Sequence, residues 1–336
     1  MGMKIHVISE TSFLVKGTGV HTAFLNHINL LREKNDVEVI VNGEGKGDVF
    51  HSHTYFLYYF WKGREYKGRR VFTAHVFPDS IKGAFPVWQL FMPIVRWGLR
   101  KAYSYADVCI AISPTVEEEI VKSGARTKIA RIFNPIDVDA WKRSDERRLK
   151  GRQMLGLNDN DFVVLGVGQV MGGKGVEDFL DVAGKVPEAK FVWTGGRPWG
   201  VMTEGLVRIN RRLRKAGPHV ILTGQLNLEQ MPLIYAASDL MIFPSFRENC
   251  PLAPLEAAAS GIPVIYRDLE EYRLLYHNPY LKAGSTAEFI DLIKRMMNDK
   301  QFYQEGLEKS KQLLKQFDKN VIRDELILLY KNLMKG

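Results

Sequence analysis

Short apolar segments with strand character alternate with helical patterns along the whole chain. This alternation is typical of parallel sheets covered by helices on both faces, because successive parallel strands are joined by crossover helices. The segments fall into two series. The first comprises residues 3–8, 37–41, 49–50, 71–74, 108–112 and 129–133, and the second comprises 162–168, 191–194, 220–223, 240–243 and 263–266. The sequence therefore predicts an α/β protein with two doubly wound domains, each binding ligands at the carboxyl ends of its strands.

A polar segment, residues 141–160, separates the two series. Domain boundaries commonly lie in such polar stretches, which few contacts cross. The length of 336 residues also suits two domains of moderate size better than one core. We therefore expect a first domain at 1–150 and a second at 151–316, followed by a terminal helical segment at 317–336.

The composition is that of a globular enzyme in a reducing compartment. Hydrophobic residues make up 46% of the chain and charged residues 25%. No run reaches the roughly 18 apolar residues that span a bilayer, and the first residues enter a strand without a signal-peptide pattern. Cys109 and Cys250 are the only cysteines, too few for a disulfide framework or a cysteine metal site. We expect the protein to work in the cytoplasm.

The excess of positive charge is concentrated in the first half of the chain. The formal net charge is +9, and residues 1–150 hold 23 lysines and arginines against 16 acidic residues. Such a field favours anionic partners, which include nucleic acid, anionic lipid surfaces and phosphorylated acceptors. Residues 85–101 mix basic and aromatic side chains in a way that suits a membrane interface, although core packing explains the run almost as well. This segment is our candidate for peripheral contact with the anionic surface on the inner face of a membrane.

Two carboxylates stand eight positions apart across a predicted strand-to-helix junction. The loop after residues 240–243 carries Glu248, and Pro251 fits the first turn of the helix that follows. Glu256 then lies about one turn into this helix. Helix-starting N–H groups point at the space between the carboxylates, so one can accept sugar hydroxyls and the other ribose hydroxyls, with a phosphate near the helix end. A solvated loop residue followed by a solvated helical one is the alternative.

A lysine stands at the start of another predicted helix. Gly172-Gly173-Lys174-Gly175 follows the strand at 162–168 and opens the helix. A lysine there opposes the helix macrodipole unless an anion lies between them. The expected anion is a diphosphate, and an exposed side chain that bends into solvent is the alternative.

The spacing of Glu248 and Glu256 resembles the E-x7-E signature of retaining glycosyltransferases of family 4. These enzymes have the GT-B fold, in which two Rossmann-like domains face a central cleft. The resemblance follows the order of elements over the whole chain and is most specific in residues 162–270. It implies an acceptor-binding first domain, a nucleotide-sugar-binding second domain and a final helix that returns to the first. It also implies retaining transfer of a hexose from a UDP- or GDP-linked donor, with no cofactor and no metal.

The same resemblance assigns roles to individual residues. His75, in Thr73-Ala74-His75, matches the active-site histidine that contacts the donor sugar, whereas His51 and His53 are expected to be structural. Lys174 would meet the diphosphate and Glu248 the donor sugar, which completes the catalytic set. The donor-binding positions are Gly17, Gly19, Gln169, Gly196, Arg197, Leu226, Asn249, Leu252 and Glu256.

The chain departs from the family pattern at two of these places. The family usually has an arginine where Gln169 stands here, so one charge-assisted contact to the diphosphate is missing. Pro251 follows Glu248 within the motif loop and has no N–H, so one backbone donor to phosphate is missing as well. Both changes bear on the affinity for the donor and on its identity.

The expected acceptor is a membrane glycolipid. Residues 266–272, with Arg267-Asp268 and Tyr272, resemble the Arg-Asp-x-x-x-Tyr tail of bacterial diacylglycerol glycosyltransferases. A soluble sugar or polysaccharide acceptor is the alternative within the same chemistry. Among other classes, a sugar-nucleotide epimerase would need further carboxylates as acid and base. A basic nucleic-acid-binding protein would explain the charge but not the convergence of Lys174 with two carboxylates, and we expect no nucleic acid partner.

Overall fold

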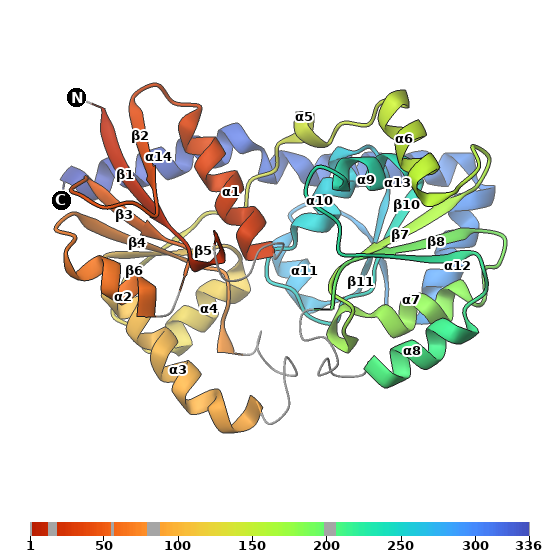
Figure 1. Cartoon of the computed structure of the whole chain (residues 1–336), viewed down its shortest axis with the longest axis horizontal. Coiled ribbons are helices and arrows are strands. Elements are labelled where there is room, and N and C mark those ends of the chain that lie inside the picture. Colours follow the sequence, from red (N-terminus) through yellow and green to blue (C-terminus); the bar gives the residue numbers. More distant parts are fainter. Residues whose placement is uncertain (1, 13–18, 55–56, 79–87, 198–205, 336) are drawn as a thin grey trace. The chain divides into compact units, whose positions relative to one another are not determined.

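The computed structural model describes residues 2–12, 19–54, 57–78, 88–197 and 206–335 (Figure 1). These residues form two compact units. The first contains the described residues up to Pro135 together with those from Phe317 on, and the second contains Ile136–Gln316. Each unit is built around a six-stranded parallel sheet. The alternation of strand and helix patterns predicts this arrangement.

The first sheet has the strand order β2-β1-β3-β4-β5-β6. Its strands are β1 (Met3–Ile8), β2 (Val37–Val41), β3 (Val49–Ser52), β4 (Arg69–Ala74), β5 (Val108–Ala111) and β6 (Lys128–Arg131). The helices of this unit are α1 (Gly19–Arg32), α2 (Leu57–Arg64), α3 (Trp88–Tyr105), α4 (Pro114–Lys122) and α14 (Lys319–Lys335), with a short turn η1 (Glu10–Ser12). The carboxyl ends of β1 and β3, where the direction of winding reverses, lie next to one another.

Alternate side chains of these strands pack on opposite faces of the sheet. One face forms a core with α1 and α14: Ile5, Val7, Val49, Val71 and Ile110 from the strands, and Phe24, Ile28, Leu326 and Tyr330 from the helices. On the other face, Phe50 stacks on Tyr59 of α2 with ring centroids 6.0 Å apart, and Phe72 meets Tyr103 of α3 edge-on. The last helix of the chain is therefore part of the core of the first unit.

The second sheet has the strand order β12-β11-β10-β7-β8-β9. Its strands are β7 (Val163–Val167), β8 (Lys190–Thr194), β9 (Val220–Gly224), β10 (Leu240–Phe243), β11 (Val264–Arg267) and β12 (Leu281–Ala283). The helices are α5 (Val138–Trp141), α6 (Asp145–Leu155), α7 (Val176–Ala183), α8 (Leu206–Lys215), α9 (Met231–Ala237), α10 (Leu252–Ala259), α11 (Glu270–Leu275), α12 (Thr286–Asn298) and α13 (Lys300–Leu314), with turns η3 (Gly172–Lys174) and η5 (Lys315–Phe317). β7 and β10 pair directly, and the winding reverses between them.

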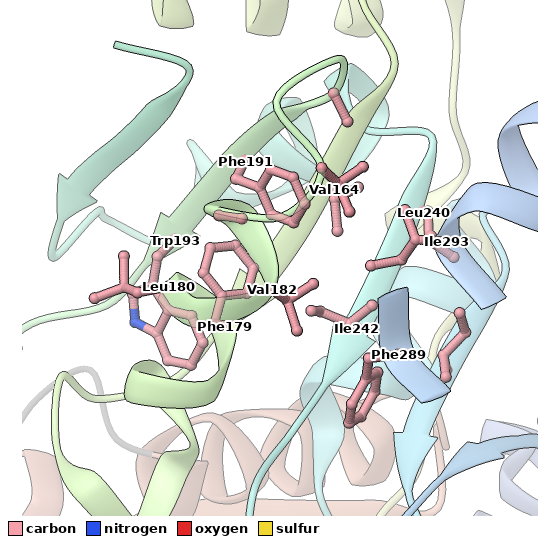
Figure 2. Close-up of a cluster of buried hydrophobic side chains, with 14 of the residues drawn as sticks. Val164, Phe179, Leu180, Val182, Phe191, Trp193, Leu240, Ile242, Phe289 and Ile293 are labelled. Atoms are coloured by element: carbon pink, nitrogen blue, oxygen red, sulfur yellow. The ribbon is translucent and has the colours of Figure 1, made fainter. Parts of the chain in front are cut away.

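The core of the second unit lies between its sheet and the helices α7 and α12. Figure 2 shows Phe179 of α7 between Phe191 and Trp193 of β8, at ring-centroid distances of 5.4 and 5.1 Å. Ile242 of the central strand β10 and Phe289 of α12 continue this layer. The buried indole N–H of Trp193 donates to the carbonyl oxygen of Gly168 at 2.9 Å, so packing in this core also fixes the carboxyl end of β7.

The division between the units falls after Pro135 and not at residue 150, where the polar composition placed it. The charged residues of this region form α6, which packs along α9 in the second unit. Arg152 of α6 is buried and donates to a carboxylate oxygen of Asp239 at 2.8 Å. A cluster of arginines around one carboxylate therefore anchors a segment that, by composition alone, has the character of a linker.

Apolar side chains on α3 are exposed. Leu90, Phe91, Ile94 and Trp97 are 75%, 48%, 67% and 65% exposed, whereas Met92 and Leu99 are buried. Core packing therefore accounts for only part of the aromatic and basic run at 89–101, and residues 85–87 of the predicted segment lie outside the described residues. Within the described part of the chain, no helix is both long enough and apolar enough to cross a bilayer.

Candidate functional site

Lys174 and Glu248 meet at the carboxyl edge of the second sheet. Lys174 lies in η3 after β7, and Glu248 lies in the loop after β10, so the two residues flank the point where the winding reverses. The Lys174 Nζ atom is 2.6 Å from Glu248 Oε1. The side chains are 28% and 12% exposed, so this ion pair is partly shielded from water. The fold thus brings together two residues of the predicted catalytic set.

Hydrogen bonds connect the two loops around this pair. The Ser245 hydroxyl lies 2.8 Å from Glu248 Oε1 and 3.2 Å from the carbonyl oxygen of Gly173. The Phe246 N–H donates to the same carbonyl at 3.0 Å. The ammonium and the carboxylate are therefore positioned by the protein before a ligand arrives, which is the condition for effective electrostatic stabilisation.

Glu256 lies in α10 and has a partner of its own. It is 7% exposed, and the Tyr235 hydroxyl of α9 donates to its Oε2 atom at 2.7 Å. Burial raises the pKa of Glu256 to about 7, and the hydrogen bond from Tyr235 lowers it in part. Any further hydroxyl that donates to this carboxylate stabilises its ionised form. Glu256 is therefore suited to hold the hydroxyls of a ribose.

The start of α10 lies at the same edge, directly after the Glu248 loop. Pro251 is the N-cap residue with extended backbone, and not the first helical residue as its type suggested. The N–H groups of Leu252 and Ala253 have no partner within the helix, as for any first turn. Of the two predicted donor contacts here, Asn249 is half-buried and precedes this turn by three residues, and Leu252 is buried and carries one of the two amides.

The other predicted donor contacts of the second unit lie after β7, β8 and β9. They are Gln169 after β7, Gly196 and Arg197 after β8, and Leu226 after β9. The Val170 N–H donates to the carbonyl oxygen of Gly196 at 2.9 Å, which joins the first two loops. Arg197 is exposed, and its guanidinium donates to the Asn210 side chain of α8 at 3.1 Å. These residues share the carboxyl edge with Lys174.

Arg267, at the end of β11, supports the Glu248 loop and is absent from the predicted set of site residues. Its Nε donates to the carbonyl oxygen of Pro244 at 2.8 Å, and its guanidinium forms an ion pair with Asp178 of α7. Its Cζ atom lies 3.8 Å from the ring centroid of Phe246. The Arg-Asp pattern at 267–268 was the sequence signal that could have indicated Arg267 as a site residue. No local pattern, however, indicates that the Arg267 side chain contacts three separate segments.

In the first unit, His75 follows β4 at the carboxyl edge of the sheet. It is buried, and its Nε2 lies 2.8 Å from Nδ1 of His53. Burial lowers the pKa of His75 to about 4, so its imidazole is neutral at pH 7. Gly19 is the first residue of α1, and an added Cβ there would meet no atom within 4 Å. Gly17 lies outside the described residues.

His27, His51 and His53 form a buried layer together with His75. His51 Nε2 is 2.6 Å from the Thr73 hydroxyl, and His51 Nδ1 is 2.5 Å from the Tyr330 hydroxyl. His27 Nε2 is 3.0 Å from the same tyrosine oxygen. His51 thus links β3 to the last helix, as a structural residue would. His53 contacts His75 directly and therefore influences which nitrogen of His75 carries the proton.

Two doubly wound parallel sheets in one chain, with a lysine and two glutamates in the turn, loop and helix that follow strands of the second sheet, define the GT-B class of glycosyltransferases. The family profile described as glycosyl transferases group 1 matches residues 161–299, and the profile described as glycosyltransferase family 4 matches residues 19–140. The chain belongs to glycosyltransferase family 4, and the protein is a glycosyltransferase. The resemblance inferred from the glutamate spacing is confirmed.

Two curated relatives match over most of the chain. The alpha-galactosylglucosyldiacylglycerol synthase of Streptococcus pneumoniae is 29% identical over 94% of this chain and 86% of that protein. The processive diacylglycerol alpha-glucosyltransferase of Acholeplasma laidlawii is 26% identical over 89% of this chain and 90% of that protein. Among solved structures, Anabaena HepE in complex with UDP-glucose has a TM-score of 0.77 at 18% identity, covering 98% of this chain and 100% of that one. This likeness confirms the fold.

Proposed function

We propose that the protein transfers a hexose from a UDP-linked donor to a hydroxyl of a membrane glycolipid, with retention of the anomeric configuration. The observation that carries the proposal is the ion pair of Lys174 and Glu248 at the switch point of the second sheet. The two relatives, an alpha-galactosylglucosyldiacylglycerol synthase and a diacylglycerol alpha-glucosyltransferase, support the acceptor. The complex of HepE with UDP-glucose supports the choice of uridine.

The donor would be held by groups of opposite charge. The Lys174 ammonium and the free N–H groups of Leu252 and Ala253 suit the diphosphate, because a helix start and a cation both favour anions. Glu248 suits the hydroxyls of the hexose, and Glu256 those of the ribose. The exposed guanidinium of Arg197 and the loop at Leu226 would lie toward the base. Each role follows from the kind of atom that the side chain presents.

The transfer breaks the bond between C1 of the hexose and the diphosphate oxygen and forms a bond from C1 to the acceptor oxygen. For retention, the acceptor hydroxyl attacks on the face from which the diphosphate departs. The acceptor proton then passes to an oxygen of the leaving diphosphate, so no separate side-chain base is required. Lys174 contributes by stabilising the charge that develops on the diphosphate. His75, neutral and in contact with His53, is suited to orient a hydroxyl of the hexose.

The exposed surface of α3 supports an acceptor in a membrane. Leu90, Ile94 and Trp97 project from one helix together with Arg96 and Lys101, which are exposed as well. A helix with apolar and basic residues on its surface is suited to the interface of an anionic bilayer. A soluble sugar acceptor would give no reason for these apolar side chains to be exposed.

The proposal is tested by donor binding and transfer in purified protein. We expect UDP-glucose or UDP-galactose to bind and GDP-mannose not to bind in calorimetry. Lys174→Met should weaken donor binding about 10- to 100-fold, since a charge-assisted contact contributes about 1.5–3 kcal/mol. Lys185→Met, at an exposed lysine of the same unit, is the matched control and should bind normally.

Transfer is then measured with radiolabelled donor and two acceptors, a glucosyl diacylglycerol in detergent micelles and a soluble alkyl glucoside of the same sugar. The glycolipid should be the better substrate, and the product should keep the anomeric configuration of the donor by NMR. Unchanged donor binding in Lys174→Met would contradict the assigned site. Equal or better use of the soluble glucoside would contradict the lipid acceptor.

A further inference from the structure

We propose that His53 is a positioning residue that holds His75 in the tautomer with its proton on Nδ1. His75 then offers a bound sugar a hydrogen-bond donor, and neither of its ring nitrogens is available as a base. This inference deepens the proposed function, because its consequence for transfer rests on His75 as the residue that orients a hexose hydroxyl. The tautomer itself can be measured without that assumption.

The fold gives His53 a defined place beside His75. His53 directly follows β3 and His75 directly follows β4, and these two strands pair in parallel. The His53 N–H donates to the carbonyl oxygen of Ile8 at 2.9 Å, which ties the backbone to the end of β1. On the other side, the Ser52 hydroxyl donates to the carbonyl oxygen of Thr54 at 3.0 Å. The backbone around His53 is therefore fixed on both sides, and with it the direction of the imidazole.

The two imidazoles meet edge to edge. His53 Nδ1 and His75 Nε2 are 2.8 Å apart, whereas the ring centroids are 5.1 Å apart and the ring planes differ by 23°. Nearly parallel rings whose nitrogens are so much closer than their centres share a hydrogen bond through their edges and not a face-to-face contact. Burial lowers the pKa of both histidines, so both rings are neutral at pH 7. One of the two facing nitrogens therefore carries a proton, and the other accepts the hydrogen bond.

The other nitrogen of His53 decides which ring is the donor. His53 Nε2 is buried and has no hydrogen-bond partner among the residues that the structure describes. The rings packed against His53 are those of Phe24, His27 and His51, with centroids 5.6, 4.6 and 4.8 Å away. If His75 were the donor, the proton of His53 would be on Nε2, as a buried N–H without an acceptor. Such orphaned N–H groups are rarer in proteins than buried acceptors without a donor.

The favoured arrangement therefore has His53 donating from Nδ1, which leaves His75 with its own proton on Nδ1. The Nε2 atom of His75 is engaged by His53, and its Nδ1 atom is protonated, so His75 does not take the proton of the acceptor. Its Nδ1–H can donate to a hydroxyl oxygen of the hexose. This assignment agrees with a transfer in which the acceptor proton passes to the leaving diphosphate.

NMR of the wild-type protein measures the tautomer directly. The sample is the full-length protein with ¹⁵N-labelled histidine at neutral pH, and long-range ¹H–¹⁵N correlations distinguish protonated from bare ring nitrogens. The signals of His53 and His75 are assigned by substituting each residue in turn. We expect both rings to be protonated on Nδ1 and bare on Nε2. A proton on Nε2 of His75 would overturn the inference.

Two substitutions of equal size test the consequence for transfer. His53→Asn can place an amide N–H close to the position of Nδ1, so His75 keeps its Nδ1 proton and kcat should stay within about threefold of wild type. His53→Asp can only accept, so the proton of His75 moves to Nε2 and kcat should fall roughly tenfold, as for the loss of one hydrogen bond. UDP should bind both variants as it binds wild type, because its predicted contacts lie in the second unit.

Tyr330→Phe is the structural control, since it removes a hydroxyl that contacts His27 and His51 in the same buried layer. It should lower the free energy of unfolding and leave kcat within about twofold of wild type. Equal kcat in His53→Asn and His53→Asp would show that packing is what His53 contributes, and would overturn the positioning role. If His53→Asp does not fold, the tautomer of the wild-type protein decides.

The inference and the proposed function fail in different ways. A wild-type protein that shows the Nδ1–H tautomer of His75 but transfers no hexose to the glycolipid would contradict the function and leave the tautomer standing. A protein that transfers hexose with the proton of His75 on Nε2 would overturn only the role of His53.

Discussion

At the scale of single residues, Glu256 is the group whose charge state should respond most to a bound donor. Its carboxyl is buried within α10, where the Tyr235 hydroxyl donates to it, and burial raises its pKa to about 7. In the free protein near pH 7, the protonated and ionised forms are therefore both populated. Ribose hydroxyls that donate to the carboxylate would favour the ionised form.

Donor binding should consequently release protons. At pH 7 we expect about half a proton to be released per bound UDP-glucose, because about half of the Glu256 carboxyls are protonated beforehand. Calorimetric titrations in phosphate and in Tris buffer, which differ in ionisation enthalpy, measure this release. In Glu256→Gln the release should vanish and the donor should bind more weakly. Identical heats in both buffers between about pH 6 and 8 would contradict the role of Glu256.

At the scale of elements, the turn η3 and the loop after β10 form one structural unit. Gly175, between η3 and α7, has φ of 73°, a backbone conformation that favours glycine. A Cβ there would lie 2.2 Å from the carbonyl oxygen of Pro244. Gly175 therefore lets the Lys174 turn approach the Glu248 loop, and the ion pair depends on that approach.

Gly175→Ala should lower the free energy of unfolding by about 1–3 kcal/mol, through backbone strain and the forced shift of Pro244. It should also weaken donor binding, because the two loops separate. Gly173→Ala is the matched control, since nothing lies within 4 Å of its Cβ position and its φ is not positive. Urea unfolding followed by circular dichroism measures both variants. Equal stability of the two would show that the close approach is not required.

At the scale of the whole molecule, residues far apart in the chain meet in the buried histidine layer. His27 of α1 and His51 of β3 both contact the hydroxyl of Tyr330, which lies in the last helix. Burial lowers the pKa of His27 to about 3 and that of His75 to about 4, and it lowers those of His51 and His53 well below the ordinary value of 6.5. The folded protein thus holds four neutral imidazoles together.

This layer should make the protein sensitive to acid. Between about pH 6.5 and 4 the unfolded chain binds protons on these histidines and the folded chain does not, so the free energy of unfolding falls as the pH falls. Each histidine contributes up to about 1.4 kcal/mol per pH unit in that window. Urea unfolding from pH 8 to 5 measures the slope. His27→Gln should reduce it, and His277→Asn, at an exposed histidine, should not. A stability that does not change with pH would contradict the neutral layer.

Local patterns were sufficient to predict the order of strands and helices, and local spacing also accounts for hydrogen bonds at or just before the starts of helices. Ser113 caps α4 by accepting from the Val116 N–H, and Asn227 and Gln230 exchange the two hydrogen bonds of a capping box. These contacts join residues three positions apart, so sequence spacing specifies them. The strand series likewise determined the doubly wound class, because buried parallel strands and crossover helices each leave a local pattern. The family resemblance then predicted Lys174 and Glu248 as site residues, and the fold brings these two side chains together.

Only the tertiary structure decided which distant residues meet. Arg267 reaches Pro244, Asp178 and Phe246, and His53 lies against His75, although no spacing in the chain predicts either arrangement. Composition placed α6 in a linker, whereas its packing on α9 places it in the second unit. The sequence also did not determine that Ile94 and Trp97 are exposed, since an apolar run has the same sequence pattern in a core and on a surface. Sequence patterns record each residue's neighbours along the chain, but burial, pKa and ion pairing depend on neighbours in space, which the packing of sheets and helices determines.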